Sequence, residues 1–157
     1  MAKKNSYDEV DELLNDIKSD IQDTLLDEVL DEVKRIEIEH VRDDVFGVYK
    51  PSIYERRSSG SGGIDDPDNI VGEIYDMRLE VDNITRFNDG YGTYNHGRGL
   101  ADLINDGSTT QGYFYDYPGE FNNARPFIDN TIDEIERTDD VENALAKGLK
   151  RRKYDIS

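Results

Sequence analysis

The sequence has no cysteine among its 157 residues, which excludes both a disulfide framework and a thiolate metal site. It also lacks long apolar runs, since none approaches the ~20 residues that a membrane-spanning helix needs. The segment Met-Ala-Lys-Lys-Asn-Ser at the start has no apolar core of the kind found in secretory signal peptides. We therefore expect a protein that is made in a cytoplasm and has no membrane partner.

Positive charge is scarce as well. The chain has 36 acidic and 19 basic residues, which gives a net charge of −17. An ordinary nucleic-acid-binding protein needs a basic footprint, because binding releases counterions from the phosphates, so this class is disfavoured. The bases are also unevenly placed, since residues 147–157 carry a net charge of +4 and residues 1–146 carry −21. We expect this basic tail to dock on an acidic neighbour.

The length fits a single domain over residues 1–157. Residues 1–46 are assigned to a long N-terminal helix, because apolar residues recur there in steps of three and four from about residue 8 to residue 41. Residues 36–41 alternate briefly, so the helix either ends early or bends there. Its acidic side is either an ordinary solvated surface or a surface that must not bind the molecule opposite it.

Residues 47–69 are predicted to form an extended interface loop. The segment combines an aromatic and proline turn, an arginine pair and a Ser/Gly stretch of linker composition. Loops of this length in a small domain are usually functional or mobile. The pattern therefore favours a segment that becomes ordered against a neighbouring subunit.

Residues 70–137 are predicted to form a small antiparallel sheet and a closing helix, so the fold class is α+β. Residues 70–87 alternate as one strand with Tyr75, Met77, Leu79 and Val81 on the buried face. A glycine-rich loop follows at 88–99, then a helical turn at 100–105 and an aromatic strand at 111–117. The closing helix spans about 127–137, with Phe127, Ile128, Ile132 and Ile135 inward. Residues 138–157 form a basic tail, helical over 141–149.

No pattern for catalysis, a cofactor or a metal survives inspection, so we expect no enzyme. His40 and His96 lie on a helix and in a glycine loop, with no motif that links them. The glycine loops lack the strand–GxGxxG–helix context of a phosphate cradle. The acids at 65, 66 and 68 are arranged as in a calcium loop, but Ile70 and Val71 occupy positions that an EF-hand needs for other residues.

Six residues are candidates for subunit contacts. Arg56 and Arg57 are either ordinary exposed loop arginines or a pair that binds an acidic patch on the next copy. Arg125 has the same two interpretations, and Phe127 is most simply a core residue. Aromatic residues are frequent interface anchors. The full set is Tyr49, Tyr54, Arg56, Arg57, Arg125 and Phe127.

Several short motifs resemble, in the same order, a family of phage structural proteins. These are the head–tail joining or tail-completion (neck) proteins of long-tailed phages of Gram-positive bacteria. The motifs are Val48-Tyr49, Tyr54-x-Arg56-Arg57, Gly62-Gly63, Asp66, Asn69-Ile70, the segment 100–107 (LADLINDG) and the segment 124–131 (ARPFIDNT). They span about residues 45–135. This sequence departs from the pattern in a compressed aromatic turn, where only Lys50 separates Tyr49 from Pro51, and in a longer Ser/Gly hinge.

The resemblance implies a long N-terminal helix, a small antiparallel sheet and a C-terminal helix, with no enzymatic activity. It implies a virion protein of the neck that forms a six-fold homo-oligomeric ring, with the head connector or stopper protein and the tail tube protein as partners. DNA would pass through the lumen without specific binding. Two alternatives stay open: a minor capsid or connector-stopper protein, and an acidic inhibitor that mimics DNA.

Overall fold

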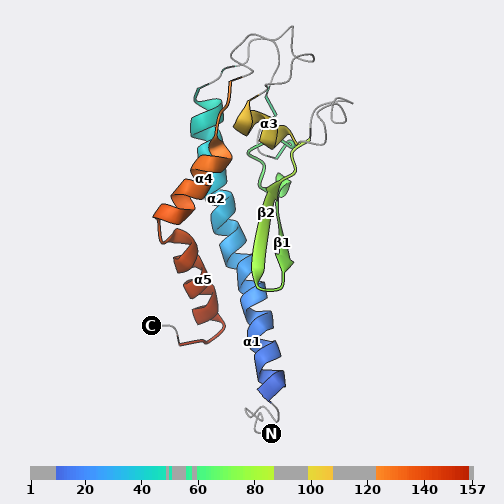
Figure 1. Cartoon of the computed structure of the whole chain (residues 1–157), viewed down its shortest axis with the longest axis vertical. Helices are drawn as coiled ribbons and strands as arrows, with labels where there is room; N and C mark the ends of the chain where they lie inside the picture. The colour runs from blue at the N-terminus through green and yellow to red at the C-terminus, as the bar shows by residue number, and fades with distance from the viewer. Residues whose placement is uncertain are drawn as a thin grey trace.

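A computed structural model describes residues 10–48, 50, 56–57, 60–86, 99–107 and 123–155. The architecture is α+β, with one long helix, a two-stranded antiparallel sheet and C-terminal helices (Figure 1). The glycine loop at 88–98 and the aromatic strand at 111–117, both expected from the sequence, lie outside the described residues. Within the described parts of the chain, no helix has the length and apolarity needed to cross a membrane.

The long helix runs from Val10 to Phe46, about 55 Å at 1.5 Å per residue. It comprises α1 (Val10–Thr24), a π-helical turn at Leu25–Val29, α2 (Leu30–His40) and a second π-helical turn at Val41–Phe46. Backbone angles stay helical across each junction, so the chain does not break there. The long helix therefore does not end at residues 36–41. Instead, the wider π-helical turn begins at Val41, where the sequence suggested that the helix ends or bends.

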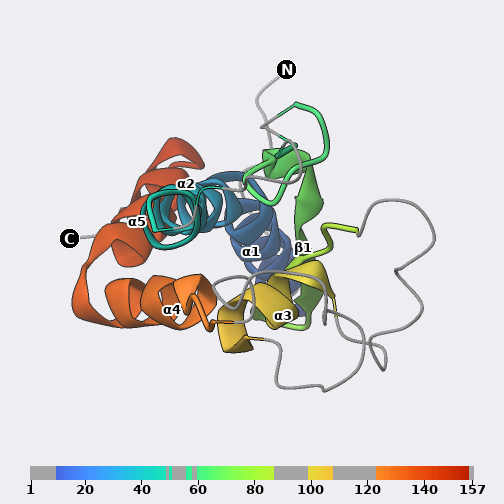
Figure 2. The same cartoon turned by 90° about the horizontal axis from the view of Figure 1, so that it is seen from above.

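The other elements pack on different sides of this helix. The hairpin of β1 (Ile70–Tyr75) and β2 (Arg78–Asn83) lies along one side, and α4 (Phe127–Arg137) and α5 (Asp140–Arg151) follow each other along another (Figures 1 and 2). Gly72 lets the sheet approach closely, because a Cβ built there would lie 2.9 Å from a methyl carbon of Leu30. The hairpin, α4 and α5 thus all pack on the long helix.

The hairpin corrects the expectation of one continuous strand over 70–87. The chain reverses at Asp76 and Met77, and Asp76 has φ of +59°, a conformation that Asp tolerates better than most residues. Paired residues such as Ile74 and Leu79 point to the same face, so the inward positions are even-numbered in β1 and odd-numbered in β2. Tyr75 is therefore on the outer face and 51% exposed, and Met77 lies in the turn and is 42% exposed, so neither is buried as expected.

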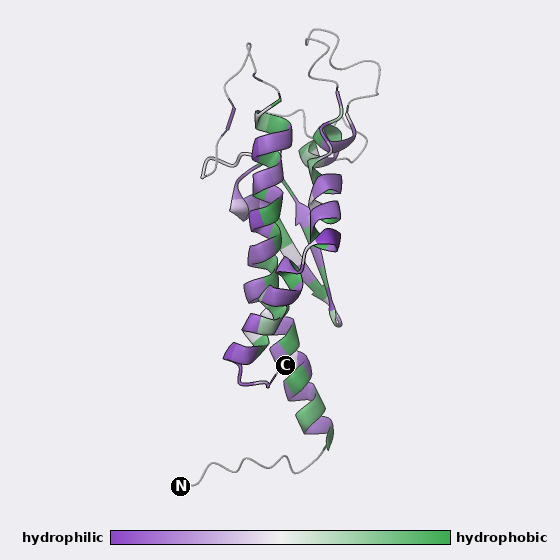
Figure 3. Ribbon diagram, turned by 90° about the vertical axis from the view of Figure 1, so that its left-hand side faces the viewer, coloured by the Kyte–Doolittle hydropathy of each residue, from purple (hydrophilic) through white to green (hydrophobic). Residues whose placement is uncertain are grey.

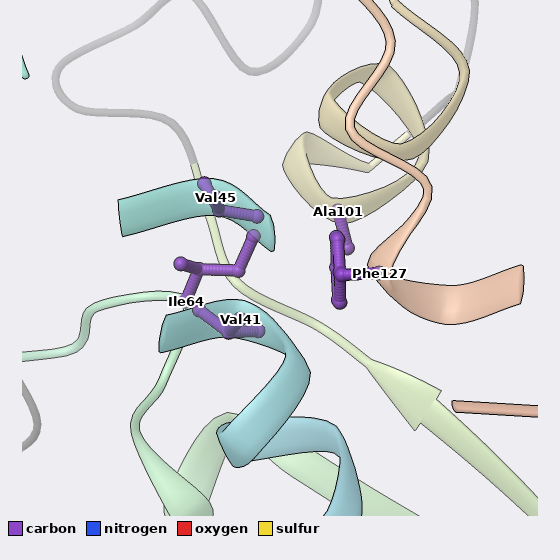
Figure 4. Close-up of a cluster of buried hydrophobic side chains, with 5 residues drawn as sticks. All are labelled: Val41, Val45, Ile64, Ala101 and Phe127. Atoms are coloured by element: carbon purple, nitrogen blue, oxygen red, sulfur yellow. The ribbon is translucent and has the colours of Figure 1, made fainter. Parts of the chain in front are cut away.

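The core sits at the upper end of the long helix. Phe127, at the start of α4, is fully buried beside Ala101 of α3 (Leu100–Asp106), where the end of the helix and the loop before β1 also meet (Figure 4). The buried cluster is Val41, Val45, Ile64, Ala101 and Phe127. Gly107 has φ of +75° and ends α3, as the sequence predicts.

The bounds of α4 agree with the predicted closing helix, but one inward residue is wrong. Ile132 is 49% exposed, whereas Thr131 is buried in its place. The buried face of α4 is centred on Phe127 and Thr131, which are four residues apart and so lie above one another. Ile132 lies about 100° further around the helix and faces outward.

Candidate interaction surface

The described residues contain no group of three His, Cys, Asp or Glu side chains that could hold a metal ion. An open hollow lies beside His40, lined also by Asn130, Asp133, Glu134, Glu136 and Arg137. His40 itself is engaged, since Nδ1 lies 3.0 Å from Asp44 Oδ2 and Nε2 lies 2.9 Å from Glu134 Oε2. This arrangement ties the long helix to α4.

The loop at residues 60–69 is built around the Asp66 carboxylate. It accepts hydrogen bonds from the backbone N–H groups of Gly60 (2.9 Å), Gly62 (2.9 Å) and Asp68 (3.1 Å). These bonds favour the charged form, so the N–H of Gly62 first, and then that of Asp68, lower the pKa of Asp66. Of the acidic residues that are arranged as in a calcium loop, Asp66 therefore serves to close a turn.

A buried polar network fixes the same loop to the helix and to the sheet. Asn83 donates from Nδ2 to Glu37 Oε1 (2.7 Å) and to the carbonyl of Ile64 (3.1 Å), and its Oδ1 accepts from the Thr85 hydroxyl (2.6 Å). Asn69 donates to the carbonyl of Gly63 at 2.8 Å. Residues 60–69 are therefore ordered by contacts within the chain, whereas the sequence suggested ordering against a neighbouring subunit.

Arg56 and Arg57 both bind other parts of their own chain. Arg56 lies with its guanidinium carbon 4.7 Å from the centre of the Phe46 ring, and its Nη1 donates to the Phe46 carbonyl at 3.3 Å. Arg57 donates from Nη2 to the Arg86 carbonyl. Both residues are half-buried at the end of the long helix. Tyr49 and Tyr54 lie outside the described residues.

The remaining two interface candidates face inward. Arg125 is buried, with its backbone N–H bonded to the carbonyl of Ile104 at 2.9 Å, so it fixes the entry to α4 against α3. Phe127 is fully buried in the core. Its side chain stabilises this chain and leaves no surface for a second subunit, in agreement with the simpler interpretation of its sequence context.

The basic end of the chain docks on the acidic helix of the same chain. Arg152 pairs with Asp27 at 2.8 Å and Glu28 at 3.1 Å, Arg151 also pairs with Glu28, and the Tyr154 hydroxyl donates to Asp20 at 2.7 Å. Gly148 allows the approach, since a Cβ there would lie 2.4 Å from a Thr24 carbon. Lys147, Lys150 and Lys153 are exposed, and none has an ion pair among the described residues.

The first two turns of α1 extend beyond the hairpin and the C-terminal region, the described parts of the chain that pack beside α1. The hairpin tip reaches only as far as Lys18 and Gln22, both of which contact Asp76, and Tyr154 at the other side reaches Asp20. Residues 10–17 therefore project past both neighbours, and their apolar stripe continues into solvent (Figures 1 and 3). Val10 is 72% and Leu14 is 57% exposed. We call residues 10–17 the projecting end of α1.

Sequence reasoning missed the projecting end and the buried Glu37. The apolar spacing correctly predicts the stripe, but it cannot say where the covering elements stop. Glu37 sits next to fully buried Ile36, and only the pairing of Asn83 with α2 reveals why an acid is there. The sequence signal for the buried Glu37 was the position of its carboxylate within a segment of alternating apolar residues.

Comparison with known proteins supports a phage origin. The model of one protein family, YomN, matches residues 9–151. The chain is 33% identical over 114 residues to the "SPbeta prophage-derived uncharacterized protein YomN" of Bacillus subtilis (strain 168), covering 71% of this chain and 69% of that protein. No solved structure matches. Neither description names a head–tail joining role, so the expected neck family stays a prediction. The family match covers nearly the whole chain, and the protein belongs to the YomN family.

Proposed function

We propose that the protein is a structural component of a phage particle, a tail-completion or tail-terminator subunit of the neck. Copies would form a six-fold ring between the head connector and the tail tube. The observation that carries the proposal is the kinship with a prophage-derived protein over most of the chain. The proposal assigns the protein to the virion, after synthesis in the host cytoplasm.

The charge of the chain suits a ring that DNA must pass. The whole chain carries a net charge of −17, and acidic side chains such as those of Asp23, Asp31 and Asp43 are exposed along the long helix. A lumen lined by such acids repels phosphates, so DNA slides through without being held. This role depends on surfaces and requires neither catalysis nor a cofactor.

Location in the particle tests the proposal directly. Purified particles would be labelled with gold-conjugated antibodies raised against the protein and viewed by electron microscopy. Gold at the head–tail junction supports the neck role. Gold over the capsid contradicts it and favours the minor capsid alternative.

A DNA-mimicking inhibitor is the alternative of another class, and the same charge motivates it. That function predicts no label on particles and a complex with a basic host protein that DNA displaces. Absence of the protein from washed particles, with such a complex in infected cells, would overturn the virion assignment. Particles from a deletion phage complemented with an unrelated gene serve as the control for antibody background.

A further inference from the structure

We propose that the projecting end of α1 docks on the basic end of α5 of a second copy of this chain, so that copies join head to tail. This inference deepens the proposed function and rests on its assumption that copies of the chain assemble. It assigns a defined surface to each side of the contact. The donor surface is residues 10–17, and the acceptor surface is the exposed lysines of the C-terminal region.

The donor surface is an incomplete packing surface. Leu13 and Ile17 are half-buried, while Val10 and Leu14 on the same stripe are mostly exposed. A helix buries such a stripe against another element, and among the described residues the elements that cover the rest of the helix stop near residue 20.

Charge decides which surface covers this stripe. Asp11, Glu12 and Asp16 surround the apolar residues on the projecting end and are all exposed. Two such ends placed against each other would bring like charges together, which disfavours a symmetric contact between α1 helices. The partner surface must therefore be basic.

The chain itself offers one such surface in its C-terminal region. Lys147 and Lys150 lie on the side of α5 that faces away from the long helix, because Gly148 between them faces Thr24. Lys153 follows directly. The arginines of the same region are already paired with Asp27 and Glu28, so the lysines are the charges left for a second molecule.

A contact between two different surfaces has a direction. Each copy carries one donor and one acceptor, so the interface is heterologous and repeats from copy to copy until it closes as a ring or continues as a filament. A symmetric contact would stop at a dimer. This difference makes the inference testable by mixing variants.

The experiment uses two variants of the full chain. V10E/L14E adds charge to the donor stripe, and K147E/K150E/K153E reverses the acceptor. Both sets of positions are exposed, so circular dichroism should show folded protein. I132E, at an exposed isoleucine of α4, and R137E, at an exposed arginine, are the matched controls. Mass would be measured by analytical ultracentrifugation.

We expect wild type and controls to assemble, and each variant alone to lose at least about tenfold in self-association. An equal mixture of the two variants should give a dimer and nothing larger, because only one functional pair of surfaces remains. Raising the salt from about 0.1 M to 1 M shortens the Debye length from about 10 Å to about 3 Å and should weaken wild-type assembly.

Two results would overturn the inference, and they are distinguishable. If wild type assembles and both variants assemble equally well, copies join through other surfaces, and the projecting end serves a different partner. The proposed ring then stands. If wild type stays monomeric at every concentration tested, both this inference and self-assembly in the proposed function fail.

Discussion

Glu37 is an acid in a position that the long helix would otherwise fill with an apolar side chain. It is 6% exposed and accepts a hydrogen bond from Asn83. Burial raises the pKa of Glu37, the Asn83 hydrogen bond opposes that shift, and the charge of Asp82 adds to it. The folded state therefore holds the proton more tightly than the unfolded state does.

The contribution of Glu37 to the stability of the fold therefore depends on pH. The stabilising contribution of Glu37 is fully present below its unfolded pKa and is lost as pH rises through the raised folded pKa. E37Q keeps an oxygen for Asn83 and carries no charge, so it should be more stable than wild type at neutral pH. The gain should shrink toward pH 4. Urea unfolding at several pH values measures it, with E136Q at an exposed site of α4 as control.

A second prediction at this scale concerns Gly148. Replacing glycine by alanine inside a helix usually stabilises it by about 0.5–1 kcal/mol. In α5 the added Cβ would lie 2.4 Å from Thr24 Cγ2 and 2.6 Å from Glu28 Oε2. G148A should therefore lower the free energy of unfolding by about 1–3 kcal/mol, whereas N143A, at an exposed position of α5, should change it by less than about 0.5 kcal/mol. A G148A protein as stable as wild type would show that α5 packs more loosely on the long helix.

At the scale of elements, His40 links the long helix to α4. Its two ring nitrogens contact Asp44 and Glu134, and Asn130 donates to Asp44 at 2.9 Å. A double-mutant cycle with H40A and E134Q should give a coupling energy of about 0.5–1.5 kcal/mol in chemical unfolding. The pair H40A and E136Q is the control, because Glu136 makes no hydrogen bond or ion pair to His40 among the described residues. Additive effects in both cycles would mean that the contact does not stabilise the fold.

Elements with their own local signals could be predicted from the sequence. The periodic apolar stripe predicts the long helix, Gly107 predicts the end of α3, and the segment around Pro126 predicts the start of α4. The hairpin could not be predicted, because Asp76 is followed by Met77 and not by the glycine of an Asp-Gly turn, and because the alternation of the sequence continues through the turn. The reversal is specified by packing on the long helix, where Lys18 and Gln22 both contact Asp76.

The interaction surfaces were only partly predictable, for a similar reason. The sequence identifies Arg56, Arg57 and the basic tail as unusual in an acidic chain. Whether a charge meets its own chain or a second one depends on tertiary contacts, and the structure places Arg151 and Arg152 on Asp27 and Glu28 of the same helix. The exposed lysines and the projecting end of α1 can be identified as candidate surfaces only when those contacts within the chain are known.

At the scale of the whole molecule, substitution of the arginine pair tests whether the predicted interface loop at residues 47–69 contributes to assembly. R56E/R57E is expected to leave the monomer folded and to abolish ring formation, because the reversed charges would face an acidic neighbour. R56K/R57K keeps the charge and is the matched control. Since Arg56 also lies over Phe46, circular dichroism and unfolding must accompany the measurement of mass. Normal rings from R56E/R57E would refute this role.

If the protein connects the phage head to the phage tail, deletion of its gene from the parent phage should leave the two structures unjoined. Lysates would be examined by electron microscopy, with the gene supplied on a plasmid as control. The account predicts DNA-filled heads beside separate tails of normal or excess length, and intact particles when the gene is restored. Intact, infectious particles without the gene would contradict it and remove the protein from the neck.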